Sequence, residues 1–353
     1  MPLKKCQTAI REECMPEFLC IFASMKIGKL DLGNFPLFLA PMEDVSDPPF
    51  RKLCRQHGAD MVVTEFISTE GLIRDAEKSV KKLEIFPEER PVAIQIFGHN
   101  LESVLASLRK IEEAEPEVID INYGCPVKKV VQKGAGAAFL KDPGRMERFT
   151  REIVRHASLP VTVKTRIGWD ENSINIVEVA LRMQDAGVQA IFIHGRTRSQ
   201  MYGGKADWDI IARVKHHPDM EIPVVANGDI DTPQKAALIR DHYGLDGAMI
   251  GRGAIGQPWI FRQMRHYLET GELLPDPALG ERIAMVKTYL QDAVRWKGER
   301  LAVLEARRHY AKYFKGLPGF KPWRMRLVTA GTVAEVFGIL DDLVQEFGEN
   351  FSW

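Results

Sequence analysis

Eight short apolar runs constrain the fold of this chain more than any other feature of its sequence, because each is followed by a polar or glycine-bearing turn and then by a helical pattern. Successive runs end roughly 25 to 40 residues apart, the size of one βα unit. The runs, each given with the number of its first residue, are FPLFLAPM at 35, ADMVVTEF at 59, VAIQIFG at 92, VIDINYGCP at 118, PVTVKTRIG at 160, VQAIFIHGR at 188, IPVVANGD at 222 and GAMIGRGA at 247. Eight strands that alternate with helices predict an α/β fold, a (β/α)8 TIM barrel. A doubly wound open sheet is the structural alternative.

The segments between these runs have apolar residues at three-and-four spacing, which indicates amphipathic helices. Three of them are NLESVLASLRKIEEA from 100, DPGRMERFTREIVRHA from 142 and NSINIVEVALRMQDAG from 172. Each begins with Asn or Asp, and the last ends at Gly187, as helix caps often do. We expect them to form the outer ring of the barrel.

A second domain follows the barrel. After Pro258 the strand signals stop, and residues 277–348 have helical patterns only, interrupted near KGLPGFKPW. We therefore predict a barrel domain over residues 25–270 and an all-helical domain over 277–353. Residues 1–24 form an N-terminal extension, for which a misassigned start codon is our preferred explanation, with Met25 as the true start.

Composition excludes a membrane-spanning protein, because no run of 18 apolar residues occurs in the 353. The five cysteines are Cys6, Cys14, Cys20, Cys54 and Cys125. Their odd number and wide spacing, without any C-x-x-C, argue against a zinc site and for a reduced, cytoplasmic setting. We expect no metal.

Charge is balanced over the whole chain but not within it. Residues 295–326 contain ten Lys or Arg and two acids, a net charge of +8. Aromatic residues lie among these cations, and the combination suits phosphates and bases of RNA. The alternative is a solvated cationic helix whose aromatics face the core, and the spacing of Tyr310, Tyr313 and Phe314 resembles a packing stripe.

Functional residues of a barrel lie at the carboxyl ends of its strands, and the loops after strands seven and eight often bind phosphate. Here those two ends are Asn227-Gly228-Asp229 and Gly251-Arg252-Gly253. Glycines allow backbone N–H groups to approach an anion, and Arg252 adds a guanidinium. Ordinary turns would explain either motif alone.

Three polar residues lie within apolar strands. Lys164 needs an anionic or electron-rich partner unless its side chain extends to the barrel rim. Gln95 and Asn122 suit hydrogen bonds to a heteroaromatic ring, although satisfied core amides would look the same. His194, at the next strand end, is an acid, a phosphate donor or a structural histidine.

Cys125 follows a strand end and precedes a loop with Lys and Gly residues. Such a thiol can be exposed, and Lys128 and Lys129 would lower its pKa, so that it could act as nucleophile or proton donor. Cys54, within the helical pattern FRKLCRQHGAD, is better explained as a buried apolar residue. No Walker A, H-E-x-x-H or strand-anchored G-x-G-x-x-G motif is present, so any redox group must be held by the barrel itself.

Six segments together resemble the tRNA-dihydrouridine synthases, most closely the bacterial B type. They are LAPMEDVSDPPFR, DINYGCPVKKVVQKGAGAAFL, VTVKTRIGWD, IHGRTRSQMYGGKADW, VVANGDI and GAMIGRGAIGQPWIF, and the resemblance extends from about residue 25 to the C-terminus. It implies an FMN-binding barrel, a helical tRNA-binding domain, and reduction of the C5–C6 double bond of particular uridines by NADPH.

The resemblance also implies roles for individual residues. Cys125 would be the general acid that protonates C5 of a uracil whose C6 receives a hydride from reduced FMN. The residues implied to bind FMN are Pro41, Met42, Gln95, Asn122, Lys164, His194, Asn227, Gly228, Asp229, Gly251 and Arg252, of which Asn122 would also face the target base. The cationic residues expected to bind tRNA are Lys128, Lys129, Arg166, Arg196, Arg307, Arg308, Lys312, Lys315 and Arg324. We expect residues 128–136 to act as a mobile flap, and the protein to be a monomer without an obligate protein partner.

Three other functions would share some of these features. An FMN-dependent oxidoreductase of free pyrimidines, like dihydroorotate dehydrogenase, would share the barrel and the cysteine but would not need the +8 segment. A Schiff-base lyase would use Lys164, and an RNA-binding barrel protein would have no catalytic role.

Overall fold

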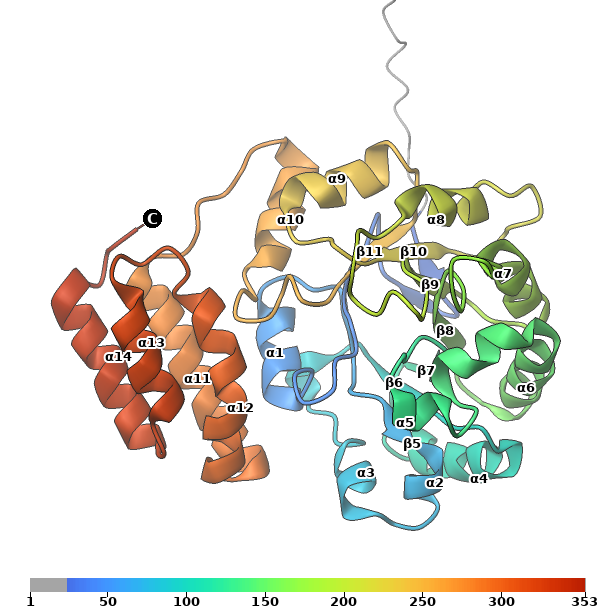
Figure 1. The fold of residues 1–353 in the computed structure, drawn as a ribbon, viewed down its shortest axis with the longest axis horizontal. Helices are drawn as coiled ribbons and strands as arrows, with labels where there is room; N and C mark the ends of the chain where they lie inside the picture. The colour runs from blue at the N-terminus through green and yellow to red at the C-terminus, as the bar shows by residue number, and fades with distance from the viewer. Residues whose placement is uncertain (1–23, 353) are drawn as a thin grey trace, which may run out of the picture.

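The computed structural model describes residues 24–352 and contains the predicted barrel (Figure 1). Each of the eight apolar runs contains a strand. The strands are β3 (Leu37–Leu39), β4 (Met61–Val63), β6 (Val92–Phe97), β7 (Val118–Asn122), β8 (Val161–Arg166), β9 (Ile191–His194), β10 (Val224–Asn227) and β11 (Gly247–Ile250). The expectation for the N-terminal extension concerns residues that, apart from Ser24, lie outside the described part of the chain.

The sheet is closed, which excludes the doubly wound alternative. Neighbouring strands pair in parallel in the order β4-β3-β11-β10-β9-β8-β7-β6, and β4 pairs with β6 to complete the ring. A short further strand, β5 (Ile67–Ser68), pairs with β6 on the same side as β4 but nearer the carboxyl end of β6. Because all of these strands are parallel, their carboxyl ends meet at one end of the barrel.

Alternate residues of each strand face opposite sides, so the strands contribute to two apolar cores. Residues such as Leu37, Val62 and Ile94 belong to the large core that includes the surrounding helices. The other set forms a separate core, which includes Phe38, Met61 and Phe192 and fills the barrel. That interior core also includes Met25, Ile27 and Leu32 of the hairpin formed by β1 (Lys26–Ile27) and β2 (Leu30–Asp31), so the hairpin packs against the barrel interior.

Longer helices cover the outside of the barrel, as the three-and-four spacing predicts, and short helices lie in its loops. They are α1 (Pro48–Gln56), α2 (Thr69–Leu72), α3 (Glu77–Lys81), α4 (Leu101–Glu112), α5 (Lys128–Val131), α6 (Pro143–His156), α7 (Ile176–Asp185), α8 (Trp208–Lys215), α9 (Pro233–Asp241) and α10 (Ile260–Thr270), with 3-10 turns at Pro87–Glu89 and Gly136–Lys141. Two predicted caps are confirmed: Asn100 accepts from the N–H of Ser103, and Asp142 accepts from that of Arg145.

Residues 279–347 form a helical region beside the barrel (Figure 1). Its helices are α11 (Leu279–Lys297), α12 (Glu299–Tyr313), α13 (Phe320–Thr329) and α14 (Val333–Phe347). The predicted interruption near KGLPGFKPW separates α12 from α13. The break at Gly298 was not predicted, and there the backbone has a φ of 79°, which favours glycine.

The aromatic residues of α12 confirm the packing-stripe interpretation. Tyr310, Tyr313 and Phe314 are buried, as is His309. The idea that these rings stack on RNA bases is therefore wrong, because they are already covered by neighbouring helices. Among the described residues, no helix is long and apolar enough to cross a membrane.

Candidate active site at the carboxyl end of the barrel

Polar side chains occupy the interior-facing positions near the carboxyl ends of the strands, where the apolar interior core stops. They come from five consecutive strands, and the register of the sheet places them next to one another. The residues are Gln95, Asp120, Asn122, Thr162, Lys164, Arg166, His194 and Asn227. Because they lie on one end of a closed barrel, they form a single polar surface at its mouth.

Gln95 and Asn122 are joined to each other and to an acid. The Asn122 side-chain amide donates to Oε1 of Gln95 at 2.7 Å, and Nε2 of Gln95 donates to Asp120 at 2.6 Å. The hydroxyl of Thr162 donates to the other oxygen of Asp120 at 2.6 Å. Burial raises the pKa of Asp120 to about 6, against the opposing effect of these two donors. Both amides are thus satisfied by protein partners.

Cys125 is buried, which corrects the expectation of an exposed thiol with a lowered pKa. Burial raises its pKa, opposed by the N–H of Val127 and by the charge of Arg166. Cys125 forms a small apolar cluster with Val130 and Ala135, and Phe66 and Phe97 from other segments pack against this cluster, which could not be located from sequence. A raised pKa keeps the thiol protonated at neutral pH, which suits a proton donor better than a nucleophile.

The Lys/Gly loop packs back onto Cys125. The N–H of Ala137 donates to the carbonyl of Cys125 at 3.1 Å. Gly136 has a φ of 57°, and a Cβ there would lie 3.0 Å from the same carbonyl oxygen, so the approach requires glycine. Lys128 and Lys129 begin α5 with exposed side chains. Whether this loop moves as a flap stays a prediction.

Lys164 is half-buried, and its ammonium has no hydrogen-bond or ion-pair partner among residues 24–352. Burial, followed by the charge of Arg166, lowers its pKa to about 8. His194 is also buried, and burial followed by the charges of Lys164 and Arg166 holds its pKa well below the ordinary value. The imidazole is therefore neutral, with Nδ1 2.8 Å from Oδ1 of Asn227.

The ends of β10 and β11 present free backbone donors. In the described part of the chain, no acceptor is found for the backbone N–H groups of Gly228, Asp229, Gly251 and Arg252. Gly228 has a φ of 109°, and a Cβ there would lie 2.9 Å from that of Ala206. Unpaired N–H groups at two adjacent glycine turns can bind an anion.

Asp229 joins two arginines beside these donors. Its carboxylate lies 2.6 Å from the guanidinium of Arg196 and 3.1 Å from that of Arg252. Partial burial opposes its ionisation, but the N–H of Ala206 and the Arg196 side chain outweigh burial and lower its pKa. Asn227 has a different role, since its amide donates to the carbonyl of Met249 at 2.7 Å and connects β10 to β11.

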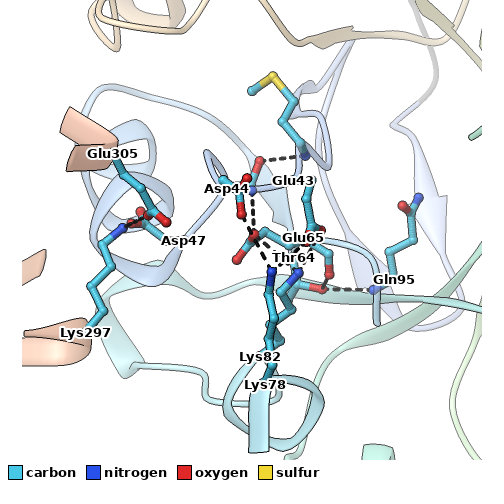
Figure 2. A network of polar contacts seen from close by, with 12 residues as sticks. Glu43, Asp44, Asp47, Thr64, Glu65, Lys78, Lys82, Gln95, Lys297 and Glu305 are labelled. Carbon is cyan, nitrogen blue, oxygen red and sulfur yellow. Dashed lines mark hydrogen bonds and ion pairs between the residues drawn. The ribbon is translucent and has the colours of Figure 1, made fainter. Parts of the chain in front are cut away.

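Pro41 and Met42 follow β3 and lead into an acidic loop, whose Glu43 and Asp44 are shown in Figure 2. Carboxylate oxygens of Glu43, Asp44 and Glu65 lie within 4.8 Å of one another. Two lysines balance them: Lys82 lies 2.7 Å from Glu43 and 3.4 Å from Glu65, and Lys78 lies 3.4 Å from Glu43. These ion pairs with lysine explain the close approach of the three carboxylates without a metal ion.

Two arginines that we expected to bind tRNA donate hydrogen bonds to backbone carbonyls of the protein. Arg166 is buried and donates to the carbonyls of Gly124, Thr197 and Met201. Arg196, also buried, donates to those of Gly203 and Gly204. Both therefore order the loops around the mouth, and a direct contact with RNA stays a prediction for each.

The cationic side chains of the helical region point in different directions. Arg307 points inward and donates to the carbonyl of Ala330 at 3.0 Å. Arg308 donates to the carbonyl of Asp44, and Lys312 donates to that of Arg252 at 2.5 Å, so both connect α12 to the barrel mouth. Lys315 and Arg324 are exposed.

Sequence reasoning missed Asp120 and Thr162 in the site. Both side chains face the barrel interior, as those of Asn122 and Lys164 do, because Asp120 lies two residues before Asn122 and Thr162 lies two residues before Lys164. A search for polar residues at every second position of the strands would have found them.

Comparisons with known proteins identify relatives over most of the chain. The family model described as "Dihydrouridine synthase (Dus)" matches residues 38–350. "tRNA-dihydrouridine synthase B" of Pseudomonas aeruginosa is 41% identical over 300 residues, which cover 85% of this chain and 90% of that protein. The protein of the same name from Vibrio vulnificus is 40% identical over 291 residues, covering 82% and 89%.

Solved structures support the barrel fold alone. Histamine dehydrogenase from Rhizobium sp. 4-9 superposes with a TM-score of 0.54 at 10% identity, over 76% of this chain and 50% of that one. 2-Naphthoyl-CoA reductase superposes with a TM-score of 0.52 at 12% identity, over 69% and 52%. The present chain thus spans about half the length of both structures.

Proposed function

This chain belongs to the dihydrouridine synthase family, and from that premise we propose that it uses FMN and NADPH to reduce the C5–C6 double bond of particular uridines in tRNA. Membership of the family favours this function over a free-pyrimidine oxidoreductase, a Schiff-base lyase or a silent RNA-binding protein. The observation that carries the assignment of the site is the buried thiol of Cys125 beside a polar barrel mouth with free backbone donors.

The residues present fit FMN. The unpartnered ammonium of Lys164 and the neutral imidazole of His194 suit an electron-rich ring and its surroundings. The four backbone N–H groups without acceptors, at Gly228, Asp229, Gly251 and Arg252, suit the ribityl phosphate. Pro41 and Met42, together with Gln95, Asn122 and Asn227, would line the remaining cofactor site.

Cys125 would supply the proton. When bound, reduced FMN provides the hydride that adds to C6 of the uracil. A thiol whose pKa is raised by burial stays protonated until C5 becomes basic, and then transfers its proton. Asn122, two residues beyond Asp120 on the same strand face, would hold the base within reach of that thiol.

A uracil inside folded tRNA must leave the base stack to reach this mouth. The exposed cations Lys128, Lys129, Lys315 and Arg324 would bind the backbone phosphates, with Arg308 and Lys312 closer to the barrel. We therefore propose that residues 277–353 act as a tRNA-binding domain on a barrel domain of residues 25–270. We further propose that the enzyme is a cytoplasmic monomer.

Dihydrouridine mapping tests the function. A bacterial strain that lacks its dihydrouridine synthases would receive the wild-type gene or its Cys125→Ala variant, and its tRNA would be sequenced for dihydrouridine. We expect the wild type to restore the modification at a defined set of positions. Absence of restoration, with a purified protein that is colourless and does not bind FMN, would contradict the proposal.

A further inference from the structure

We propose that Asp120 is a positioning residue for Cys125, and that it acts through a directional chain of hydrogen bonds that ends at the backbone of the cysteine. This proposal rests on the proposed function, in which the thiol protonates the base. We call the set Thr162, Asp120, Gln95, Asn122 and Cys125 the Asp120 chain.

The contacts of the Asp120 chain are continuous. Beyond the contacts from Thr162 to Asp120, from Gln95 to Asp120 and from Asn122 to Gln95, the side-chain oxygen of Asn122 accepts two backbone N–H groups. These are the N–H of Cys125 at 2.8 Å and that of Gly124 at 3.1 Å. The turn that carries the thiol is therefore hydrogen-bonded to the side-chain amide of Asn122. That amide is bonded to the amide of Gln95, which is bonded to the carboxylate of Asp120.

Asp120 fixes the direction of the chain at its buried end, as the two backbone N–H groups do at the end nearest the thiol. A side-chain amide has a donor end and an acceptor end of nearly equal size, so either orientation would fit the space. A carboxylate can only accept, and it therefore selects the orientation in which Gln95 presents Nε2 to it. Oε1 of Gln95 then selects Nδ2 of Asn122, and the oxygen of Asn122 is left to face the two N–H groups.

The reversed chain would be unfavourable at each link. A turned Gln95 would place its oxygen against a carboxylate and its amide nitrogen against that of Asn122. A turned Asn122 would in turn leave the N–H groups of Gly124 and Cys125 without an acceptor. All of these groups are buried or nearly so, where unmade hydrogen bonds are costly.

The position of Asp120 explains the use of an acid there. It is 1% exposed in the barrel interior and contacts neither the thiol nor any free surface, so it acts only through its neighbours. Both of its oxygens are used, one by Thr162 and one by Gln95. An acceptor-only group is what this location requires, and among neutral side chains an amide could serve only if a neighbour fixed its orientation.

Thr162 provides the test, because its hydroxyl can donate or accept. In Asp120→Asn, the new amide can accept from Gln95 while donating to Thr162, so the direction of the chain survives. Thr162→Val leaves the carboxylate and its direction intact. In Asp120→Asn/Thr162→Val, the amide at 120 has no acceptor for its donor end, so only the two backbone N–H groups at the other end still favour the native direction, and the reversed orientation becomes less costly. Asp120→Asn/Thr162→Ser keeps a hydroxyl and is the matched control.

The experiment combines turnover with a measurement that needs no tRNA. We expect kcat for dihydrouridine formation, measured at saturating FMN because Gln95 and Asn122 also line the proposed cofactor site, to fall by about ten- to a hundred-fold in the Val double variant, with KM for tRNA unchanged. Alkylation of Cys125 by iodoacetamide in the flavin-loaded protein, followed by mass spectrometry, should accelerate severalfold in the same variant only. Equal effects in the Val and Ser double variants, or additive effects of the single substitutions, would overturn the proposal.

Two outcomes separate this proposal from the assignment of Cys125. Full activity of Cys125→Ala would refute the general acid, while the alkylation pattern would still report on the Asp120 chain. If the Val double variant does not fold, Gln95→Leu breaks the chain one link closer to the thiol. Because Gln95 also lines the proposed cofactor site, this variant and the wild type are compared without FMN; the variant should then be alkylated faster, and an unchanged rate would overturn the chain.

Discussion

Lys297, at the end of α11, forms a buried ion pair with Asp47, which lies 250 residues away in sequence and begins α1 (Figure 2). The same carboxylate caps α1 by accepting from the N–H of Phe50, and the same ammonium also contacts Glu305. Asp47 ends the loop that starts at Pro41 and Met42. One short segment therefore connects the expected cofactor site to the helical region.

Lys297→Met should destabilise the protein by about 3–5 kcal/mol, because it leaves the buried carboxylate of Asp47 without its partner. Urea denaturation of the purified protein, followed by fluorescence, measures the change. The control is Arg109→Met, which removes an exposed ion pair with Glu113 and should change the stability little. Equal effects in the two variants would show that the Lys297 pair does not hold the helical region to the barrel.

The sequence predicts what depends on local periodicity. The eight strands and their polar ends follow from alternating or apolar runs, and the parallel arrangement then places Gln95, Asn122 and Lys164 at one mouth. The environment of Cys125 could not be predicted, because Phe66, Phe97 and Ala137 reach it from separate segments. Similarly, nothing in the sequence distinguishes Arg307, which points inward, from Arg308, which reaches the barrel.

Cys125→Ala should retain FMN and tRNA binding and lose dihydrouridine formation, because the substitution removes the proton donor and leaves the barrel mouth intact. Single-turnover assays with prereduced enzyme separate the protonation step from reduction by NADPH. The matched control is Cys54→Ala, which removes a buried thiol of α1. Undiminished turnover in Cys125→Ala would refute the general-acid role.

Lys164→Met should lower the FMN content of the purified protein, because it removes an ammonium that lacks a protein partner and keeps a side chain of similar length. Absorbance of flavin per protein chain measures the occupancy, and titration with free FMN measures the affinity. Lys29→Met, at the opposite end of the barrel, is the control and should retain full occupancy. Unchanged affinity in Lys164→Met would remove Lys164 from the cofactor site.

The double variant Lys315→Ala/Arg324→Ala should weaken tRNA binding and reduce its salt dependence. Each lost phosphate contact is expected to make the negative slope of log K against log salt shallower by roughly 0.7 to 0.9. Filter binding over a range of salt concentrations measures the slope. Arg307→Ala is the contrasting variant, because its guanidinium is bonded to the carbonyl of Ala330, and its slope should match that of the wild type. Identical slopes in all three proteins would exclude Lys315 and Arg324 from the tRNA surface.

The last prediction concerns acid stability and His309. This imidazole is buried between the barrel and the helical region, against the rings of Phe50 and Tyr289. Its Nδ1 accepts from the N–H of Gly256 at 3.1 Å, so it must be neutral there. Burial, followed by the charges of Arg308 and Lys297, lowers its pKa to about 3.

Since the unfolded chain takes up a proton at this position near its ordinary pKa of 6.5 and the folded chain does not, stability is lost as the pH falls from 6.5 towards 3. The loss from this one group amounts to at most about 1.4 kcal/mol for each pH unit. His309→Asn keeps an acceptor for Gly256 but cannot be protonated. We expect it to be less stable than the wild type at pH 7.5 and to lose less stability between pH 6.5 and about 4.5. Urea denaturation at several pH values measures both slopes, and parallel slopes would show that His309 is not the group responsible for this loss of stability at acid pH.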